Sequence, residues 1–269
     1  MPRMYVNGVN LAYATAGAGY PVLFITGLSY GGWFWEQQVP AFADRFRVLT
    51  FDNRGSGQSD KPDLAYTAAM LADDTVGLMR GLGMTRAHII GHSMGGFVAQ
   101  ELALRYPQQV DHLVLAATHF GGPNAVPIPR EALAVILNRE GDAETLYRRG
   151  IAVATAPDFA AAHPAVIDDI VRRRLADAQP AYAYQRQAGV SLAFRAEDRL
   201  GDIKAPTLIL AGERDLVVPP ANAALMAKKL PHAQRLIFQG AGHLFPLEQP
   251  ERFNDVVLRF LGHGGQRMP

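Results

Sequence analysis

Residues 91–95 read Gly91-His92-Ser93-Met94-Gly95, and this stretch decides the fold class. The pattern Gly-X-Ser-X-Gly is typical of a serine held at the tip of a sharp turn between a strand and a helix. A short apolar strand, His88–Ile90, precedes it, and a helical pattern, Phe97–Arg105, follows it until Pro107 ends the helix. Such a turn strains the serine and crowds the positions two residues away, where only glycine or another very small residue fits. An ordinary glycine-rich turn is the alternative, but this context favours a nucleophilic Ser93 with the N-terminus of a helix directed at it.

Apolar runs and helical segments alternate on both sides of this turn. Continuous apolar runs of this length indicate strands that are buried on both faces of a parallel sheet. Strands are predicted at Pro21–Ile25, Arg47–Phe51, Leu113–Ala117, Thr207–Ala211 and Arg235–Phe238, a hairpin at Met4–Val6 and Val9–Thr15, and helices at Thr67–Arg80, Ala221–Leu230 and Phe253–Leu261. The alternation predicts an α/β fold, with a mostly parallel sheet of the eight-stranded type and helices on both faces.

Between Gly121 and Leu200 the alternation stops, and no strand is predicted. Helical patterns occur near Arg130–Asn138, Ala143–Ala152, Pro164–Ala178 and Ala181–Phe194, separated by prolines. We interpret residues 121–200 as an all-helical insertion, and residues 1–120 together with 201–269 as the core domain. Because the insertion begins after a strand end, it should attach at the carboxyl edge of the sheet, cover the site and supply most substrate contacts.

A nucleophilic serine needs a base, and the base needs a carboxylate that orients it. Asp215 follows one predicted strand, and His243 follows the next. The carboxyl ends of parallel strands meet at one edge of a sheet, so both side chains should reach Ser93 there. The chain order serine, aspartate, histidine is also the one found with this kind of turn. The sequence therefore predicts Ser93, Asp215 and His243 as a catalytic triad.

Two of these assignments have a rival. Glu213 is closer than Asp215 to the end of its strand, and a solvated loop charge is its other interpretation. His119 also follows a predicted strand and competes with His243 for the role of base; packing beneath the insertion is its other interpretation. The remaining histidines are placed elsewhere: His88, His112 and His232 before or at the start of strands, His163 in the insertion, His263 in the tail, and His92 beside the nucleophile but directed away from it. Edge placement and chain order favour Asp215 and His243.

Acyl transfer also requires hydrogen-bond donors for the oxyanion that develops on the carbonyl oxygen. We expect two backbone N–H groups to serve: that of Met94, which follows the nucleophile, and that of Leu28, in the loop after Pro21–Ile25. The residues expected around the substrate are Gly27, Trp33, His92, His119 and Leu244. For Trp33, which begins the aromatic run Trp33-Phe34-Trp35, core packing is the alternative.

Neither the motifs nor the composition indicates a cofactor or a metal. The glycine-rich loop Asp52–Gly57 lacks the lysine and helix of a phosphate-binding loop, so we interpret it as an Asp–Arg pair that braces the loop near the site. The 269 residues include no cysteine, and no spacing of other ligands predicts a metal site. A net charge of +1 gives no reason to expect nucleic acid or a membrane as partner. With no signal-peptide pattern and no apolar run near about 20 residues, the expected location is the cytoplasm.

Five motifs together resemble the α/β-hydrolase superfamily along nearly the whole chain: Gly27-Leu28, the run Asp52–Asp60, Gly91–Gly96, Gly212–Asp215 and Gly242-His243. The chain is most similar to the bacterial group that includes carboxylesterases, enol-lactonases and carbon–carbon bond hydrolases, and its insertion resembles their helical cap. The resemblance implies a serine hydrolase that cleaves a small or medium carboxylic ester or lactone through an acyl-enzyme intermediate, without a cofactor.

The chain also departs from some members of that superfamily. Ser93 argues against epoxide hydrolases and haloalkane dehalogenases, which carry aspartate there. Thr26 stands where many relatives have histidine, and Leu244 stands where carbon–carbon hydrolases usually carry tryptophan. A carbon–carbon hydrolase, a lyase or a cofactor-independent oxygenase on the same fold is the second interpretation, and a non-catalytic small-molecule receptor is the third.

Overall fold

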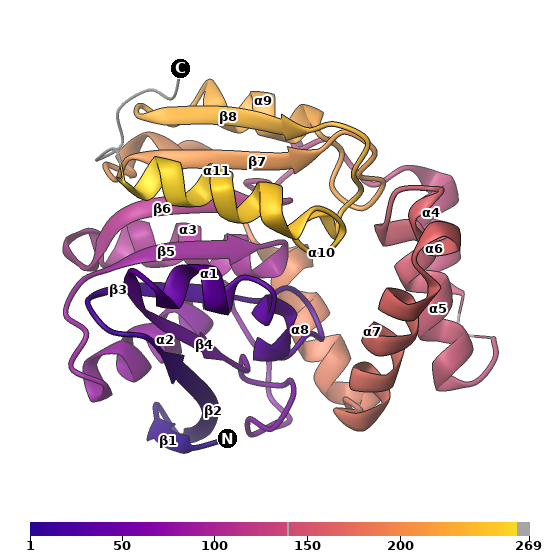
Figure 1. The fold of residues 1–269 in the computed structure, drawn as a ribbon, viewed down its shortest axis with the longest axis horizontal. Helices are drawn as coiled ribbons and strands as arrows, with labels where there is room; N and C mark the ends of the chain where they lie inside the picture. The colour runs from indigo at the N-terminus through magenta and orange to yellow at the C-terminus, as the bar shows by residue number, and fades with distance from the viewer. Residues whose placement is uncertain (139, 263–269) are drawn as a thin grey trace.

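The computed structural model describes residues 1–138 and 140–262, and its centre is one eight-stranded sheet (Figure 1). The strands are β1 Arg3–Val6, β2 Val9–Ala16, β3 Tyr20–Ile25, β4 Phe46–Phe51, β5 Ala87–His92, β6 Val110–Ala116, β7 Thr207–Gly212 and β8 Ala233–Phe238. Their order across the sheet is β1-β2-β4-β3-β5-β6-β7-β8. The β1–β2 and β2–β4 pairs are antiparallel and the other pairs are parallel, which confirms the predicted fold class.

Helices cover both faces of this sheet. One face carries α2 Ala68–Gly81, α3 Met94–Arg105 and α9 Ala221–Ala227, and the other carries α1 Val39–Ala43 and α11 Pro250–Gly262 (Figure 1). Alternate residues of a strand point to opposite faces. Leu23 and Ile89 therefore pack with the first group of helices, and Phe24 and Ile90 with the second. Because both faces are buried, the central strands are apolar throughout, which is the pattern that predicted them.

The helix after Ser93 begins earlier than its periodicity predicts. α3 starts at Met94, whereas the predicted helix starts at Phe97. Gly95 and Gly96 occupy the first turn, and glycine has low helix propensity and no side chain to contribute to an apolar stripe. The serine therefore lies directly at the N-terminus of α3.

Residues 121–200 form a group of helices beyond the carboxyl ends of the parallel strands (Figure 1). These helices are α4 Arg130–Leu137, α5 Ala143–Ala154, α6 Phe159–Ala162, α7 Pro164–Ala176 and α8 Ala181–Ala193. An isolated bridge pairs Gly121 with Arg195, and the Ala196 N–H donates to Phe120 O at 2.8 Å. The segment thus leaves and rejoins the core at one point, on the edge of the sheet that holds Ser93.

The remaining elements are short. They are the 3-10 helices Gly32–Trp35, Pro107–Gln109 and Glu197–Asp202, and the single-turn helix α10 Phe245–Glu248. Across the described ranges, no helix is both long and apolar enough to cross a membrane. His263, which the sequence places in the tail, lies outside the described residues.

Candidate active site

Ser93 occupies the tip of the turn between β5 and α3. Its φ of 55° and ψ of −120° are rare for a residue other than glycine and typically cost about 1–3 kcal/mol. The turn is held in part by the Ser93 N–H, which donates to Ala116 O at 2.9 Å. A Cβ on Gly91 would lie 2.4 Å from Gly95 O, and a Cβ on Gly95 would lie 2.3 Å from Ile25 O. Both flanking glycines are therefore required by packing.

Asp215 and His243 meet at the same edge of the sheet. They lie in the loops after β7 and β8, and His243 Nδ1 is 2.8 Å from Asp215 Oδ2. The other carboxylate oxygen, Oδ1, accepts from the N–H groups of Val217 and Val218 at 2.8 and 2.7 Å. The Asp215 side chain is fully buried and that of His243 is 7% exposed. The fixed carboxylate selects the tautomer with its proton on Nδ1 and leaves Nε2 as a proton acceptor.

Ser93 and His243 line the same cavity, which has a volume of about 180 Å³. The rest of its lining comes from loops after the strands and from the helical segment: Gly27, Leu28, Ser29, Tyr30, His92, Ile136, Gly150, Ala154, Arg174, Tyr184, Val217 and Leu244. Among the hydrogen bonds of the described residues, none joins Ser93 Oγ to His243 Nε2. Such bonds commonly tighten only when a ligand is bound. The arrangement places a serine hydroxyl and an oriented imidazole around one small volume.

The loop after β3 lies against the serine. A Cβ on Gly27 would be 3.1 Å from Ser93 Cβ, so glycine allows this close approach. Within residues 1–138 and 140–262, neither the Leu28 N–H nor the Met94 N–H donates a hydrogen bond. The two predicted oxyanion donors are therefore free to bind a ligand oxygen.

Thr26 braces this loop where many relatives carry histidine. Its hydroxyl donates to Tyr30 O at 3.1 Å. The Asn53 side-chain amide donates to Thr26 O at 3.0 Å and to Thr26 Oγ1 at 3.2 Å, and both residues are buried. A threonine–asparagine pair thus fixes the backbone on which Leu28 sits, a contact that sequence spacing does not indicate.

The second glycine-rich loop braces the site, but not through the Asp–Arg pair that its sequence suggests. Asp52 accepts from the N–H groups of Gly32 and Gln58, each at 2.7 Å, and burial raises the pKa of Asp52. Arg54 pairs instead with Asp74 of α2, at 2.7 and 2.8 Å. The predicted partner was wrong because the guanidinium extends away from the loop to a helix that is distant in sequence.

The two rival residues are held by contacts of their own, outside the Asp215–His243 pair. Glu213 accepts from the Gly240 N–H at 2.9 Å, and its side chain is 43% exposed. His119 Nδ1 accepts from the Gly121 N–H at 2.9 Å, and its ring packs against Phe97. His119 is absent from the cavity lining, contrary to its predicted pocket role, because these two contacts hold the ring beneath the start of the helical segment.

His119 should make the stability of the chain depend on pH. Burial, with the charges of His243 and Arg195, lowers the pKa of His119 from 6.5 to about 4. Between these two values the unfolded chain binds a proton that the folded chain does not, so the free energy of unfolding falls as the pH falls. From pH 7 to pH 5 this loss should be about 2 kcal/mol. In His119→Gln, whose amide oxygen can still accept from Gly121, the total loss should be smaller by this amount, because His88 and His92 keep their own lowered pKa values. Urea unfolding at both pH values measures the difference, and equal losses in the two proteins would contradict this account.

Three of the other residues predicted around the substrate, Gly27, His92 and Leu244, do line the cavity. His92 is buried, and its Nε2 donates to the His243 carbonyl oxygen at 2.9 Å. Burial and the charge of His243 lower the pKa of His92 to about 3, so its ring is neutral at ordinary pH. His92 therefore holds the backbone of the histidine loop rather than acting as a second base.

Trp33 lies outside this cavity. It lines a different cavity of about 240 Å³, where the Arg173 guanidinium carbon is 5.6 Å from the centre of its ring. The next two aromatic residues, Phe34 and Trp35, are fully buried in the core. Trp33 therefore does not line the cavity of Ser93, contrary to the prediction. In the short helix Gly32–Trp35, the aromatic side chains point in different directions.

Residues 121–200 supply five of the fourteen residues that line the cavity, fewer than the majority expected. The cavity forms at the seam with the core, so the loops after β3, β5, β7 and β8 supply the rest. A second hollow of about 230 Å³ shares five residues with it: Ser29, Ile136, Gly150, Arg174 and Tyr184. Apart from Ser29, that hollow is lined entirely by residues 121–200. The second hollow therefore continues the cavity between the helices of this segment.

Sequence reasoning missed Glu248, which ties the histidine loop to the helical segment. Its carboxylate accepts from the Gly242 N–H at 3.1 Å and from the Ala156 N–H at 3.0 Å. Burial raises the pKa of Glu248, and the charge of Asp215 adds to this effect. In the sequence, a lone glutamate at the end of a short helix cannot be told from a solvated surface charge.

Comparisons with known proteins agree with this fold. A family model described as alpha/beta hydrolase fold matches residues 20–250. The putative carbamate hydrolase RutD of Azorhizobium caulinodans is 29% identical over 265 residues, which cover 97% of this chain and 98% of the relative. Est816, an N-acyl homoserine lactone degrading enzyme, has a TM-score of 0.85 at 30% identity over 96% of this chain and 100% of its own. The enol-lactonase of Burkholderia xenovorans LB400 has a TM-score of 0.86 at 28% identity over 97% of this chain and 100% of its own. By its eight-stranded sheet, its serine turn and a family match along most of its length, this chain belongs to the α/β-hydrolase fold family.

Proposed function

We propose that the chain is a serine hydrolase that cleaves a small or medium carboxylic ester or lactone through an acyl-enzyme intermediate. The observation that carries this proposal is the cavity shared by Ser93 and His243, with the imidazole held 2.8 Å from the buried carboxylate of Asp215. Two of the similar structures are named for lactones, an N-acyl homoserine lactone and an enol-lactone, and they support a cyclic or open ester as substrate.

In the proposed reaction, Ser93 Oγ attacks the carbonyl carbon of the substrate while its proton passes to His243 Nε2. Asp215 stabilises the imidazolium that forms. The carbonyl oxygen becomes an oxyanion, which accepts hydrogen bonds from the N–H groups of Leu28 and Met94. The bond to the alcohol oxygen then breaks, and that oxygen takes the proton from His243. Water attacks the acyl group with His243 again as base, which releases the acid and restores the serine.

We also propose that residues 121–200 act as a cap on the core formed by residues 1–120 and 201–269. The segment is attached at the carboxyl edge of the sheet and contributes lining residues to both hollows. Covering the site excludes water, and this strengthens the electrostatic interactions that stabilise the oxyanion.

Arg174 of α7 brings a positive charge to this cavity. Its guanidinium carbon lies 5.0 Å from the centre of the Tyr30 ring and 4.2 Å from that of the Tyr147 ring. Its Nη2 donates to Ser29 Oγ at 2.6 Å. These contacts hold the guanidinium at the junction of the two hollows, and Arg174 lines both of them.

Arg174 differs in its ion pairs from the two arginines before it. Arg172 and Arg173, which precede it on the same helix, both pair with Asp169, whereas no ion pair within the described residues includes Arg174. An unneutralised cation in a partly desolvated cavity attracts an anion more strongly than one in open water. We therefore propose that the substrate carries a carboxylate that reaches the second hollow.

Arg174→Gln should raise KM for a substrate with a free carboxylate by about 10- to 100-fold, because a hydrogen bond to a charged group contributes about 1.5–3 kcal/mol. The matched substrates are methyl hydrogen succinate and methyl butyrate, which differ mainly in that charge. KM for the neutral ester should change by less than about threefold. Arg172→Gln, on the same helix but outside both hollows, is the control variant. Equal effects on both esters would remove the case for an anionic substrate.

The proposed function is tested by covalent labelling and a substrate screen. An organophosphonate should attach to Ser93 in stoichiometric amount, as shown by mass spectrometry of the digested protein. The screen compares p-nitrophenyl esters, lactones and diketones. Turnover of esters or lactones supports the proposal, whereas turnover of diketones alone would assign the second interpretation, a carbon–carbon hydrolase. A folded chain with neither labelling nor turnover would be a binding protein.

A further inference from the structure

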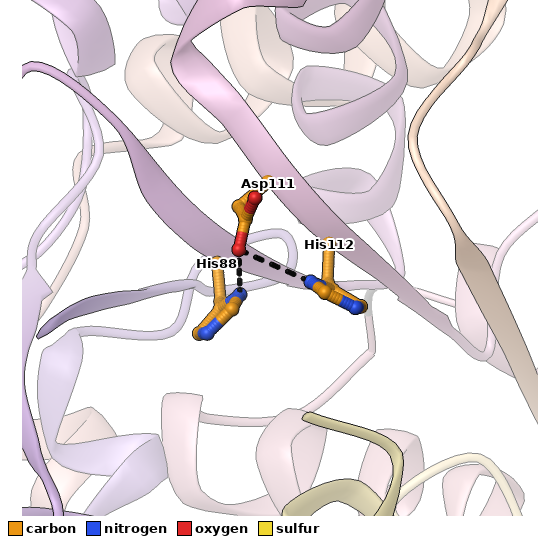
Figure 2. Close-up of side chains that lie close together, drawn as sticks. All are labelled: His88, Asp111 and His112. Carbon is orange, nitrogen blue, oxygen red and sulfur yellow. Dashed lines mark hydrogen bonds and ion pairs between the residues drawn. The ribbon is translucent and has the colours of Figure 1, made fainter. Parts of the chain in front are cut away.

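Three side chains with metal-binding atoms meet at the amino-terminal ends of β5 and β6, on the edge of the sheet opposite to Ser93 (Figure 2). Asp111 Oδ2 lies 3.4 Å from His88 Nδ1 and 3.3 Å from His112 Nδ1. The ligand atoms of all three residues lie within 4.8 Å of one another. The mechanism proposed above uses none of these groups.

A β-bulge brings the three residues together. Ala87 pairs with Val110 and Ile89 pairs with Leu113, so His88 faces two residues of β6 instead of one. In a regular strand, the adjacent residues Asp111 and His112 would point to opposite faces of the sheet. A bulge re-aims side chains and is often found beside functional sites. Here it turns both side chains of β6 toward His88 (Figure 2).

The cluster leaves one buried, ligand-type nitrogen atom without a hydrogen-bond partner. His88 is only 6% exposed, and its Nδ1, which points at the Asp111 carboxylate, has no hydrogen-bond partner among the described residues. His112 is 7% exposed, and its Nδ1 faces the same carboxylate oxygen at 3.3 Å. A buried polar atom without a partner is costly and calls for an explanation such as a bound ion. The neighbouring rings, Tyr20 beside His88 and Phe260 beside His112, restrict how far either imidazole can rotate.

We propose that His88, Asp111 and His112 bind a divalent transition-metal ion of the zinc type. Two imidazole nitrogens and one carboxylate oxygen form a ligand set that Zn²⁺ accepts, with water as the fourth ligand. Zn–N and Zn–O distances of about 2.0–2.1 Å place tetrahedral ligands about 3.3–3.4 Å apart, which matches both separations from Asp111 Oδ2. The Asp111 side chain is 23% exposed and marks the side from which the ion and its water would enter. The ion would link β5 to β6 at the end of the sheet far from the reaction.

Arg86 is the cation that faces this site. Its guanidinium lies 2.6 Å from Asp111 Oδ1, which leaves Oδ2 for the two imidazoles, and its side chain is 54% exposed. Arg86 repels an incoming cation and competes for the same carboxylate. Removing its charge should therefore strengthen metal binding, a result that a purely structural role of the cluster does not predict.

The test uses the full chain without an affinity tag, from which a chelator has first removed any metal. The chain is titrated with ZnCl₂ in a calorimeter, and the zinc that stays bound after dialysis is measured separately. One equivalent should bind per chain. His88→Gln and His112→Gln should each weaken binding by about tenfold or more, and Arg86→Gln should tighten it. His163→Gln, which alters a histidine outside the cluster, is the matched control and should bind like the parent chain. At a zinc concentration 100 times Kd, the unfolding equilibrium constant should fall by about 100-fold, measured by urea unfolding.

Cobalt substitution gives a readout in the parent protein that does not depend on any variant folding. Co²⁺ in a tetrahedral site of this kind should give visible d–d absorption that ZnCl₂ abolishes. The proposal is overturned if no stoichiometric binding occurs, if binding survives in both His88→Gln and His112→Gln, or if it is lost instead in His243→Gln. Zinc-loaded and zinc-free chains should hydrolyse esters at the same rate, because the cluster and Ser93 lie at opposite edges of the sheet.

Discussion

Replacing Ser93 with alanine should lower kcat for ester hydrolysis by about 10⁴-fold or more. The substitution removes the oxygen that attacks the carbonyl, so His243 has no proton to accept and Asp215 no imidazolium to stabilise. Such groups act as a unit, and the loss of one removes most of the benefit of the others. Residual activity would come from the backbone N–H groups of Leu28 and Met94, which are unchanged. Steady-state kinetics with p-nitrophenyl esters measure the loss, and circular dichroism confirms folding.

Ser29 provides a matched control for this experiment. It is a second serine in the same cavity, but its hydroxyl accepts a hydrogen bond from Arg174 at 2.6 Å. Ser29→Ala should change KM by less than about tenfold, as expected for one hydrogen bond, and should still be labelled by a phosphonate at Ser93. A folded Ser93→Ala protein with near-normal turnover would show that the nucleophile is assigned wrongly.

His243→Ala should be almost as damaging as loss of the serine, with kcat lower by about 10⁴-fold or more. Without the imidazole, the serine hydroxyl has no base to take its proton and the leaving group has no acid to supply one. His119→Ala should have a much smaller effect, on KM more than on kcat, because its ring contacts Phe97 and Gly121 and lies outside the cavity lining.

The two histidine variants serve as controls for each other. Both remove an imidazole near the same edge of the sheet, buried for His243 and partly buried for His119, so a general loss of packing would affect both. Kinetic constants are compared only between proteins whose urea unfolding shows a folded state at the assay temperature. If His119→Ala lost more activity than His243→Ala, the choice of base would have to be reversed.

The elements of this fold could be located from the sequence because their signals are local. Strands buried on both faces are apolar along their whole length, so a run such as Leu113–Ala117 is sufficient to place β6. The turn at Ser93 is also local, since Gly91 and Gly95 relieve crowding within five residues. Where the local signal was weak, at the glycine-rich start of α3, the predicted boundary was three residues late.

The contact between Asp215 and His243 could also be predicted. In a parallel sheet, the loops that follow the strands lie at the same edge, so residues just after β7 and β8 lie close together. That rule cannot choose between two carboxylates in one loop. Glu213 is held by the Gly240 N–H, whereas Asp215 is held by the N–H of Val218 and turned toward the imidazole. The choice depends on hydrogen bonds of the folded loop, which the strand order does not encode.

By itself, the sequence determined the α/β class, the strained serine turn, and the edge of the sheet where the serine, aspartate and histidine lie. The turn depends on short-range sterics, and the other two features depend on the order of strands and helices along the chain. Only the tertiary structure decided which side chains face one another. Arg54 reaches Asp74 rather than Asp52, and Arg174, which forms no ion pair with the described residues, enters the cavity. One extra residue opposite His88 likewise brings Asp111 and His112 together with His88. The physical reason is that ion pairs, cavity walls and bulges depend on the relative placement of segments far apart in the chain, and neither periodicity nor spacing carries that information.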